Sequence, residues 1–418
     1  MRVLILTSST GGGHNMRARS FIEWARLERP QRLHVKMHKA LESTNELLAF
    51  GVRAYNWIQR TYPGLHNVYF NLLEVAAPCD RPAKIFGQDR FRRVLDEEEP
   101  DLVLSVHGFL NHGFFDLARR HLPDVRCVTY CGELFGRYGF SRHWVNPSAD
   151  LFVGAVEETC ARARELGMPE EASMVGGFLL HPAFYQAPQT IAERRHFLGA
   201  NLALDPDRFT LLLSTGEHGA NNHIALLTSL RDRLAAPLQG RLQVIALCGR
   251  SDETFQSVRA WAQANQQFAV RPLPYADSFH MSRLLQCANA VVVRPGTGST
   301  SEAIQTGCPI VFNGIGGFMP QERITLRYAR RRGFSSEVEE AGDLPPILTP
   351  WLEDADDLGY HGKRECMIAA RPRQHPLDIL SAVINTPQRG PRSEPMAEAA
   401  KRPLPINGAA ADPSAALG

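Results

Sequence analysis

Three features that many proteins rely on are missing from this sequence of 418 residues: a long apolar run, paired cysteines and an excess of one charge. No uncharged apolar run approaches the ~18 residues that a membrane-spanning helix needs, so we expect no transmembrane segment. The eight cysteines include no CxxC pair, which favours reduced, buried thiols and gives no reason to expect a metal site. The 46 basic and 44 acidic side chains nearly cancel, so a nucleic-acid partner is not expected.

What the sequence does contain is an alternation of short β-rich runs and helical segments. The periodicity predicts helices at 16–27, 223–235, 254–264 and 301–306. Alternating strands and helices are typical of parallel sheets covered on both faces, so the predicted fold class is α/β. The predicted strands are 3–6, 102–106, 127–130, 151–155, 210–214, 243–248, 290–294 and 310–313.

The strands form two series, which predicts two Rossmann-like domains with their parallel sheets facing a central cleft. We place the first domain at residues 1–185 and the second at 186–385, ending in the helical segment "PLDILSAVIN". Residues 386–418 are rich in Pro, Ala and Gly, and we expect a disordered tail there. Ligands of doubly wound sheets bind beyond the carboxyl ends of the strands, so the cleft is the expected site.

The most informative motif is "VVVRPGTGSTSEAIQTGCPIVF" at residues 291–312. A strand gives way to Gly296, Thr297, Gly298 and Ser299, and a helix follows. Glycines allow close backbone approach, and the unpaired N–H groups at a helix start attract an anion. No Gly-Lys-Ser/Thr follows and the GxGxxG spacing is absent, so the motif is no P-loop and favours a nucleotide-sugar diphosphate. A simpler alternative is that Ser299 caps the helix and Glu302 completes a capping box.

A second glycine-rich turn, "STGGGHN", follows the apolar residues 3–6 at the N-terminus. The apolar run is too short for a secretion signal and lacks a small-residue cleavage site, so we interpret it as a strand of a cytoplasmic protein. Gly12, Gly13 and His14 therefore follow a strand end and are expected to face the cleft.

Together these segments resemble glycosyltransferase family 28, and within it most of all the branch of monogalactosyldiacylglycerol synthases and processive diacylglycerol glucosyltransferases. The resemblance covers about residues 1–335 and includes "STGGGHN", "DLVLSVH", Trp144 to Asp150 and "CGR" in the family's order. Within "PGTGSTSEAIQTGCPIVFN" and the downstream "PQE", the matching positions are Gly296, Gly298, Ser299, Glu302, Gly307, Pro309, Asn313, Gln321 and Glu322.

The resemblance implies a GT-B fold in which the first domain holds the acceptor and the second a UDP-sugar. It implies that Glu302 holds the ribose hydroxyls, the turn and Ser299 hold the diphosphate, and Gln321 with Glu322 hold the sugar. No cofactor or metal is expected, because the helix dipole can replace a cation at the diphosphate. The full donor-binding set is Gly216, Arg250, Gly296, Thr297, Gly298, Ser299, Thr300, Glu302, Gln321 and Glu322.

Glycosyl transfer needs a base for the acceptor hydroxyl, and a histidine with a pKa near neutrality suits this role. The matching histidine of the family lies on the acceptor side of catalysis, so His14 is the expected general base; the alternative is a histidine that merely caps its helix. Gly12, Gly13, His107 and Glu133 are expected beside the acceptor. Glu133 and Asp150 could instead orient His14. The family's Thr-Asp-Phe is replaced here by "TYCGELF", which leaves the acceptor open.

The predicted function is an inverting hexosyltransferase acting from a UDP-sugar on a lipid hydroxyl, with diacylglycerol as the leading acceptor. Aromatic and basic residues mix at 46–75, and Arg323, Arg327, Arg330 and Arg331 fall near one helix face. Both patterns suit a peripheral enzyme on the inner face of the cytoplasmic membrane, although an ordinary amphipathic helix has the same periodicity. The alternatives are a polyprenyl-diphosphate or soluble acceptor, a UDP-sugar epimerase, or a non-catalytic nucleotide-sugar-binding protein.

Overall fold

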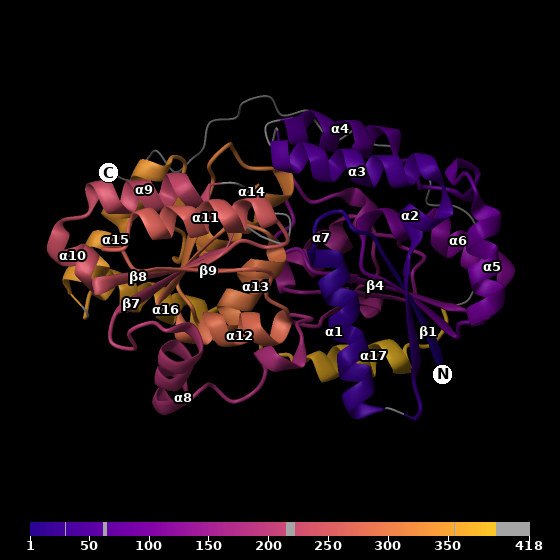
Figure 1. Cartoon of the computed structure of the whole chain (residues 1–418). Coiled ribbons are helices and arrows are strands. Elements are labelled where there is room, and N and C mark those ends of the chain that lie inside the picture. The colour runs from indigo at the N-terminus through magenta and orange to yellow at the C-terminus, as the bar shows by residue number, and fades with distance from the viewer. Residues whose placement is uncertain (30, 62–64, 215–221, 355, 390–418) are drawn as a thin grey trace, which may run out of the picture.

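The computed structural model describes residues 1–29, 31–61, 65–214, 222–354 and 356–389, which form two α/β lobes (Figure 1). Each lobe contains a six-stranded sheet in which every neighbouring pair is parallel. The strand orders are β2-β1-β3-β4-β5-β6 and β12-β11-β10-β7-β8-β9. The predicted fold class is confirmed: this is the two-domain GT-B arrangement. The strands are β1 (Arg2–Thr7), β2 (His34–Lys39), β3 (Leu102–Ser105), β4 (Arg126–Cys131), β5 (Leu151–Gly154), β6 (Ser173–Val175), β7 (Phe209–Ser214), β8 (Leu242–Leu247), β9 (Val270–Leu273), β10 (Ala290–Val293), β11 (Ile310–Asn313) and β12 (Glu337–Val338).

The eight strands predicted from sequence are present, and the four that the sequence did not predict are the outermost strands of the two sheets. The inner strands β3, β8, β10 and β11 are buried along their whole length. The outer strands β2, β6 and β9 contain no buried residue. A strand buried on both faces is a continuous apolar run, whereas an edge strand mixes polar and apolar residues and gives a weaker pattern.

Helices cover both faces of each sheet, because alternate strand residues point to opposite faces. In β1, Val3 and Ile5 pack on one side with Phe21 of α1, while Leu4 and Leu6 pack on the other. The helices are α1 (Gly13–Glu28), α2 (Ala40–Thr44), α3 (Glu46–Thr61), α4 (His66–Ala76), α5 (Gln88–Glu98), α6 (Gly113–His121), α7 (Glu157–Glu165), α8 (Ile191–His196), α9 (His223–Arg233), α10 (Ala236–Arg241), α11 (Asp252–Ala264), α12 (Ser278–Cys287), α13 (Thr297–Thr306), α14 (Pro320–Arg331), α15 (Leu344–Glu353), α16 (Leu358–Ala369) and α17 (Pro376–Asn385).

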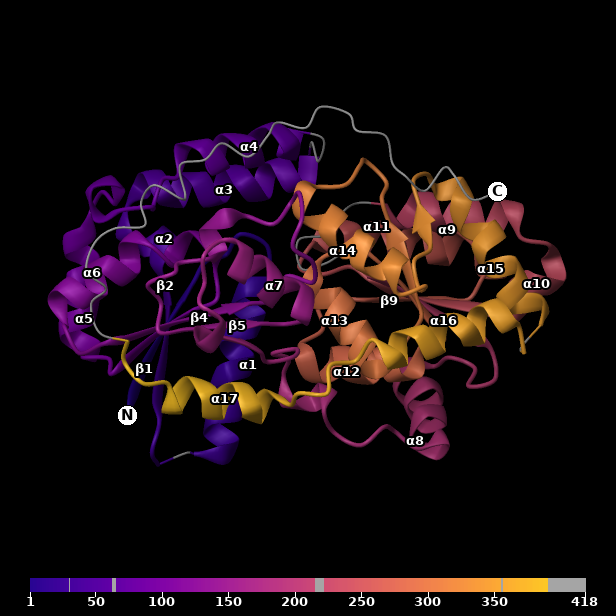
Figure 2. The same cartoon turned by 180° about the vertical axis from the view of Figure 1, so that it is seen from behind.

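The last helix, α17, lies against the first lobe, although we expected it to end the second. Figure 2 shows the chain passing from α16 back to α1, and Ile379, Leu380 and Val383 join the cluster around Val3 and Phe21. This apolar face of α17 could not be assigned to either sheet from its periodicity. The first lobe therefore contains both the beginning and the last described helix of the chain.

The two segments that connect the lobes lie side by side next to α1. A Cβ on Gly177, whose φ is +79°, would lie 2.8 Å from the carbonyl oxygen of Gln374. Trp24 of α1 packs edge-on against Tyr185 of one connection and His375 of the other, at ring distances of 5.8 and 4.9 Å. The indole of Trp24 also donates to the carbonyl of Leu180 at 2.8 Å. One aromatic cluster thus holds both connections.

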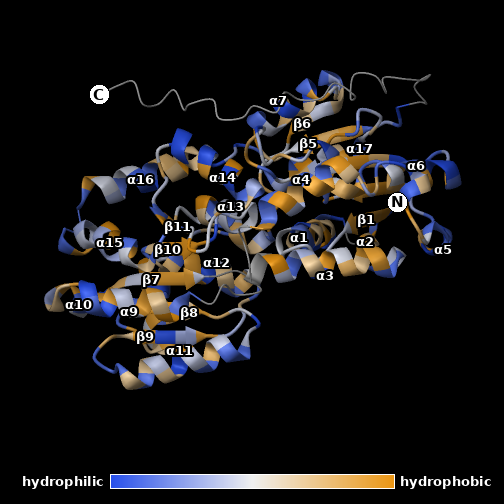
Figure 3. Cartoon of the chain, turned by 90° about the horizontal axis from the view of Figure 1, so that it is seen from above, coloured by the Kyte–Doolittle hydropathy of each residue, from blue (hydrophilic) through white to orange (hydrophobic). Residues whose placement is uncertain are grey.

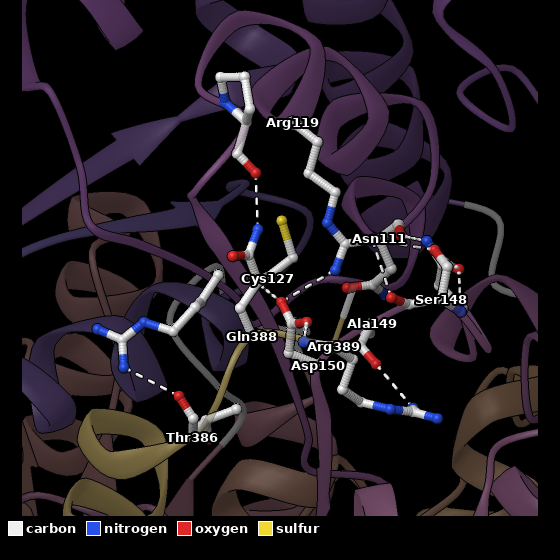
Figure 4. Close-up of polar contacts among 12 residues, drawn as sticks. Asn111, Arg119, Cys127, Ser148, Ala149, Asp150, Thr386, Gln388 and Arg389 are labelled. Carbon is white, nitrogen blue, oxygen red and sulfur yellow. Dashed lines mark hydrogen bonds and ion pairs between the residues drawn. The ribbon is translucent and has the colours of Figure 1, made fainter. Parts of the chain in front are cut away.

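Beyond α17, residues 386–389 are held against the first lobe, which corrects the expectation that the tail begins at residue 386. The side chain of Gln388 donates to the Pro123 carbonyl at 2.7 Å, and the Arg389 amide donates to Asp150 Oδ1 at 2.7 Å (Figure 4). Asp150 Oδ2 accepts from Arg119 at 2.9 Å and from the Cys127 amide at 2.6 Å. The remainder of the predicted tail, 390–418, lies outside the described residues.

Asp150 precedes β5 and so lies at the amino end of the first sheet, whereas the cleft is at the carboxyl end. The suggestion that Asp150 could orient His14 is therefore wrong. Its carboxylate is fully buried, and it pairs with Arg119 at the amino end of the sheet, away from the cleft. The sequence placed it in a family motif but could not show which sheet end it occupies.

Candidate active site between the two sheets

The two glycine-rich turns meet across the cleft, although about 280 positions separate them in sequence. Each follows a strand, β1 or β10, and each leads into a helix, α1 or α13. A Cβ on Gly298 would lie 3.3 Å from Met16 Cε and 3.9 Å from Gly13 Cα. Glycine at these positions permits the close approach of the two helix starts. The structure therefore brings together the two motifs that carried the sequence prediction.

The N-terminal turn is held in place by α3. Asn56 accepts a hydrogen bond from the Gly11 amide at 3.0 Å and donates to the Ser9 carbonyl at 2.8 Å. Gly12 is the N-cap residue of α1, and its carbonyl accepts from the Met16 amide at 3.1 Å. His14 thereby takes a defined position in the first turn of α1, rather than capping the helix.

The imidazole of His14 is oriented so that one nitrogen is left as a base. Nδ1 lies 2.8 Å from the Val106 carbonyl oxygen, which can only accept, so Nδ1 is the protonated nitrogen. Burial, with a smaller contribution from Arg17, lowers the pKa of His14 to about 4. The ring is therefore neutral at pH 7 and its Nε2 lone pair can accept a proton, but its pKa lies below the near-neutral value on which the sequence argument rested.

His107 lies directly beside His14, as the strand-end argument predicted, with ring centroids 4.4 Å apart. Its Nδ1 accepts from the Phe109 amide at 3.2 Å, so Nε2 donates to Thr10 Oγ1 at 2.8 Å. Burial and the neighbouring His14 hold the pKa of His107 well below its usual value. Trp144 completes one wall, with its ring 5.9 Å from that of His14. Both nitrogens of His107 have partners, so it is a wall residue rather than a second free base.

On the opposite side of the cleft, α13 presents an uncapped N-terminus. The helix begins at Thr297, four residues before the predicted start, and Gly296 makes no side-chain cap. The capping box suggested for Ser299 and Glu302 is absent, because both residues lie inside the helix. The first-turn N–H groups thus have no helical acceptor, and they form a site suited to an anion. The buried hydroxyl of Thr300 also has no partner among the described residues.

Two carboxyl groups near Arg17 have no hydrogen-bond partner in the described part of the chain. Glu302 lies on α13, and burial raises its pKa to about 8. Glu133 follows β4, its Oε2 atom is buried and unpartnered, and burial raises its pKa to about 7. The nearby guanidinium of Arg17 acts in the opposite direction on both pKa values. Such unsatisfied, shifted carboxyls are typical of ligand-binding positions.

Gln321 and Glu322, at the start of α14, have different surroundings. Gln321 Nε2 donates to Tyr55 Oη of α3 at 2.7 Å, while its buried Oε1 has no partner among the described residues. The Glu322 carboxylate is occupied: it accepts from Arg294 at 3.0 and 2.6 Å and from the Met319 amide at 2.9 Å. Gln321 therefore has a free oxygen, whereas the carboxylate of Glu322 is already engaged by Arg294 and the Met319 amide.

The structure shows less about the other two residues predicted to bind the donor, Arg250 and Gly216. Arg250 lies on the exposed loop after β8, and its guanidinium stacks 3.9 Å above the ring of Tyr275. Gly216 lies outside the described residues. In the described ranges, no group of three or more His, Cys, Asp or Glu side chains is arranged to hold a metal ion.

No protein-family model matches the sequence. Two curated relatives are processive diacylglycerol beta-glucosyltransferases. That of Staphylococcus carnosus (strain TM300) is 21% identical over 372 residues, covering 86% of each chain. That of Staphylococcus aureus (strain Newman) is 23% identical over 365 residues, covering 85% of this chain and 87% of the relative. The alignments thus span most of both proteins.

Among solved structures, Acinetobacter baumannii MurG matches with a TM-score of 0.54 at 13% identity, covering 92% of this chain and 99% of that one. Anabaena Alr3699/HepE in complex with UDP matches with a TM-score of 0.52 at 16% identity, over 92% and 99%. The chain is a GT-B glycosyltransferase. It is similar to glycosyltransferase family 28, as the motifs at 8–15 and 291–322 indicate. A putative UDP-N-acetylglucosamine 2-epimerase of Listeria monocytogenes shares the fold, with a TM-score of 0.52 at 12% identity over 91% and 95%, so the fold alone does not separate the two reactions.

In this glycosyltransferase the structure brings most of the predicted residues to one cleft: His14, His107 and Glu133 from the first lobe, and the α13 turn, Glu302 and Gln321 from the second. Sequence reasoning missed Arg17, Tyr55 and Arg294. Arg17 was detectable, because residues three apart share a helix face and Arg17 follows His14 by three. Tyr55 and Arg294 make contacts between distant segments and gave no local signal.

Proposed function

We propose that this glycosyltransferase transfers a hexose from a UDP-sugar to a lipid hydroxyl, with diacylglycerol as the acceptor. The observation that carries the proposal is the placement of a neutral imidazole, His14, across from the open N-terminus of α13. A base on one side of the cleft and an anion site on the other suit attack and departure at one sugar carbon. The names of the relatives support a diacylglycerol acceptor, and the complex of Anabaena Alr3699/HepE with UDP supports a UDP-linked donor.

In the proposed reaction the acceptor oxygen bonds to the anomeric carbon as the bond from that carbon to the UDP oxygen breaks. His14 Nε2 takes the hydroxyl proton, and UDP leaves on the opposite face of the sugar, so the configuration inverts. The N–H groups at Thr297 to Ser299 stabilise the negative charge that grows on the leaving diphosphate. No metal is required for this step, since these dipoles take the place of a cation.

The donor contacts follow from the free groups in the cleft. Glu302 would accept hydrogen bonds from the ribose hydroxyls, because its carboxyl has no partner among the described residues. The free Oε1 of Gln321 would accept from a sugar hydroxyl. The Gln321 contact would also satisfy a buried oxygen that has no partner among the described residues, which is favourable on binding.

The acceptor side of the proposal rests on the surface formed by α3 and α4, which we name the apolar platform. Figure 3 shows hydrophobic residues recurring along both helices. The side chains with at least half of their surface exposed are Leu47, Phe50, Trp57, Val68, Leu72 and Val75. Contiguous exposed apolar side chains of this size mark interaction surfaces. Arg53 lies on the same helix and α14 contacts α4, so basic side chains border the platform, as an anionic membrane surface requires.

No helix in the described ranges has the length and apolar character needed to span a bilayer. We therefore propose peripheral attachment through the apolar platform, on the inner face of the cytoplasmic membrane. Attachment there would present the lipid hydroxyl to the cleft, because α3 also holds the His14 turn through Asn56.

The deciding experiment incubates the protein with labelled UDP-glucose, UDP-galactose or UDP-N-acetylglucosamine and detergent-dispersed diacylglycerol. We expect UDP release that depends on diacylglycerol and a labelled lipid product. Product formed only with a polyprenyl phosphate or a soluble alcohol would contradict the lipid assignment. Conversion of the sugar without any acceptor would indicate an epimerase, and UDP-sugar binding without turnover would indicate a binding protein.

Membrane attachment is tested separately by sedimentation with phosphatidylglycerol and phosphatidylcholine vesicles. The combined substitutions Phe50→Ser, Leu72→Ser and Val75→Ser should abolish cosedimentation, because they remove the apolar area that enters the interface. The matched control is Ile191→Ser on α8, which is 77% exposed but isolated from the platform, and should change nothing. Equal binding of both variants would exclude the platform as the attachment surface.

A further inference from the structure

Arg17 is a buried cation that contacts both lobes. Its side chain extends from α1, is 4% exposed, and donates through Nη2 to two acceptors. One is the Gly132 carbonyl after β4, at 3.1 Å, and the other is Thr297 Oγ1 at the start of α13, at 2.5 Å. The first contact belongs to its own lobe and the second crosses the cleft. Arg17 therefore lies at the anion site of the opposite lobe.

The backbone beneath Arg17 is adapted to the guanidinium. A Cβ on Gly132 would lie 2.1 Å from Arg17 Nε and 2.3 Å from Cζ. Any larger side chain at residue 132 would push the guanidinium away. Glycine at residue 132 therefore allows the Arg17 guanidinium to pack directly against the backbone.

The charge of Arg17 has no carboxylate partner. In the described part of the chain no carboxyl oxygen lies within 4.0 Å of its nitrogens, although ion pairs of this kind are numerous elsewhere. Burial raises the pKa values of the nearby carboxyls Glu133 and Glu302 to about 7 and about 8, so neither is a fully ionised partner for Arg17 at pH 7. A buried cation without an anion is unfavourable, so the site is electrostatically incomplete and suited to an added negative group.

We propose that Arg17 binds the diphosphate of the nucleotide sugar, so that the first lobe supplies the positive charge to a donor held by the second. This assignment rests on the proposed function. On binding, the guanidinium exchanges the Thr297 hydroxyl for phosphate oxygens, for which its planar set of donors is well suited. As the bond between the anomeric carbon and the UDP oxygen breaks, Arg17 stabilises the negative charge that develops on the departing diphosphate.

The spacing of α1 gives this contact a mechanistic consequence. His14 and Arg17 lie three residues apart and so on one helix face. A single helix then carries both the proton acceptor and the cation at the leaving group. Their separation is fixed by helix geometry, and the diphosphate also draws the second lobe toward α1.

The test compares the dissociation constants of UDP and uridine by isothermal titration calorimetry, because uridine lacks only the diphosphate. Arg17→Met should weaken UDP about 10- to 100-fold, the range for hydrogen bonds to a charged group, and leave uridine within about threefold. Arg17→Lys should retain part of the UDP affinity. The matched control is Arg19→Met, an exposed arginine of the same helix, which should leave both affinities unchanged.

Gly132→Ala provides a second route that keeps the arginine, in case Arg17→Met does not fold. It should displace the guanidinium and weaken UDP in the same direction, again sparing uridine. Equal loss of UDP and uridine affinity in these variants, or no loss of either, would overturn the assignment of Arg17 alone. Failure of the unmodified protein to bind UDP would overturn the proposed function and this assignment together.

Discussion

The two ends of the first sheet carry buried carboxyl groups in opposite states. At the amino end, Asp150 accepts three hydrogen bonds, from Arg119, Cys127 and Arg389 (Figure 4). At the carboxyl end, Glu133 has a buried oxygen without a partner in the described ranges, and in the other lobe the Glu302 carboxyl likewise accepts no hydrogen bond from the described residues. Buried carboxylates whose hydrogen bonds are all made within the protein stabilise the fold. Those without hydrogen-bond partners are typical of sites where a ligand supplies the missing hydrogen bonds.

This difference shows that the amino end of the sheet contributes to stability, whereas the carboxyl end is adapted to ligand binding. The amino end gains stability because its charge is neutralised by Arg119 and by backbone donors. The cleft end gives up stability, since a buried oxygen of Glu133 has no partner among the described residues until a substrate supplies one. Each of the following substitutions changes a residue at the amino end or in the cleft, and the measurement shows whether stability, catalysis or UDP binding is affected.

The largest effect is expected for His14→Ala at the cleft end. Removal of the base should lower kcat about 10²- to 10⁴-fold, because the acceptor proton loses its positioned acceptor. The dissociation constant of UDP should change little, since His14 is not at the anion site. The control is His121→Ala, a surface histidine that contacts Asp96. Steady-state kinetics with labelled donor measures the effect, and a rate close to normal would remove His14 as the base.

At the amino end, Asp150→Ala should lower the free energy of unfolding by about 3–5 kcal/mol, because Arg119 and two backbone amides lose a buried partner. Urea denaturation measures this change. The kcat of the folded fraction should be unaffected. Asp207→Ala is the matched control, since its pair with Arg195 is exposed and should alter stability little. A loss of activity without a loss of stability would contradict the division between the two ends.

Glu302→Ala should weaken UDP binding by about 1–3 kcal/mol if the carboxyl holds the ribose hydroxyls. Calorimetry with 2′-deoxy-UDP sharpens the test, because the variant should bind this analogue nearly as well as UDP. Glu133→Gln, on the acceptor side of the same cleft, should leave UDP affinity unchanged. Equal discrimination against 2′-deoxy-UDP by the variant and the unmodified protein would show that Glu302 does not contact the ribose.

The smallest effect concerns pH and the stability of the cleft end. Because the pKa of Glu302 is raised from 4.5 to about 8, the folded state binds this proton more tightly than the unfolded state. The associated stability is present below pH 4.5 and is lost as the pH rises through 8. Glu302→Gln should therefore become the more stable protein as pH rises, by on the order of 1–2 kcal/mol for a partly exposed group. Urea denaturation at pH 5 and pH 9 checks the sign, and a constant difference would contradict the shifted pKa.

The sequence predicted those parts of the fold that have a strong local pattern. The buried inner strands are continuous apolar runs, and the two glycine-rich turns have compositions that few other segments share. The edge strands were missed because their half-exposed residues mix polar and apolar character. The placement of α17 was missed because an apolar helix face does not specify which sheet it covers.

The candidate site shows the same division. His14, Glu302 and Gln321 lie in short motifs and were found. Arg17 shares a helix face with His14, but its contact with Thr297 joins segments 280 residues apart and could not be predicted from sequence. Glu322 matched a family position, yet its surroundings depend on Arg294, which lies 28 residues earlier in the chain. Pairings of this kind are decided by packing between distant segments and leave no local signature.

The aromatic cluster of Trp24, Tyr185 and His375 determines how the two lobes can separate. Since both chain connections meet at this one spot beside α1, we expect the cluster to act as the pivot when one lobe rotates against the other. Displacement grows with distance from the pivot, and in Figure 1 α3 and α14 lie on the far side of the cleft from α17. Such a rotation would part the hydrogen bond between Tyr55 and Gln321 and widen the cleft beside the apolar platform.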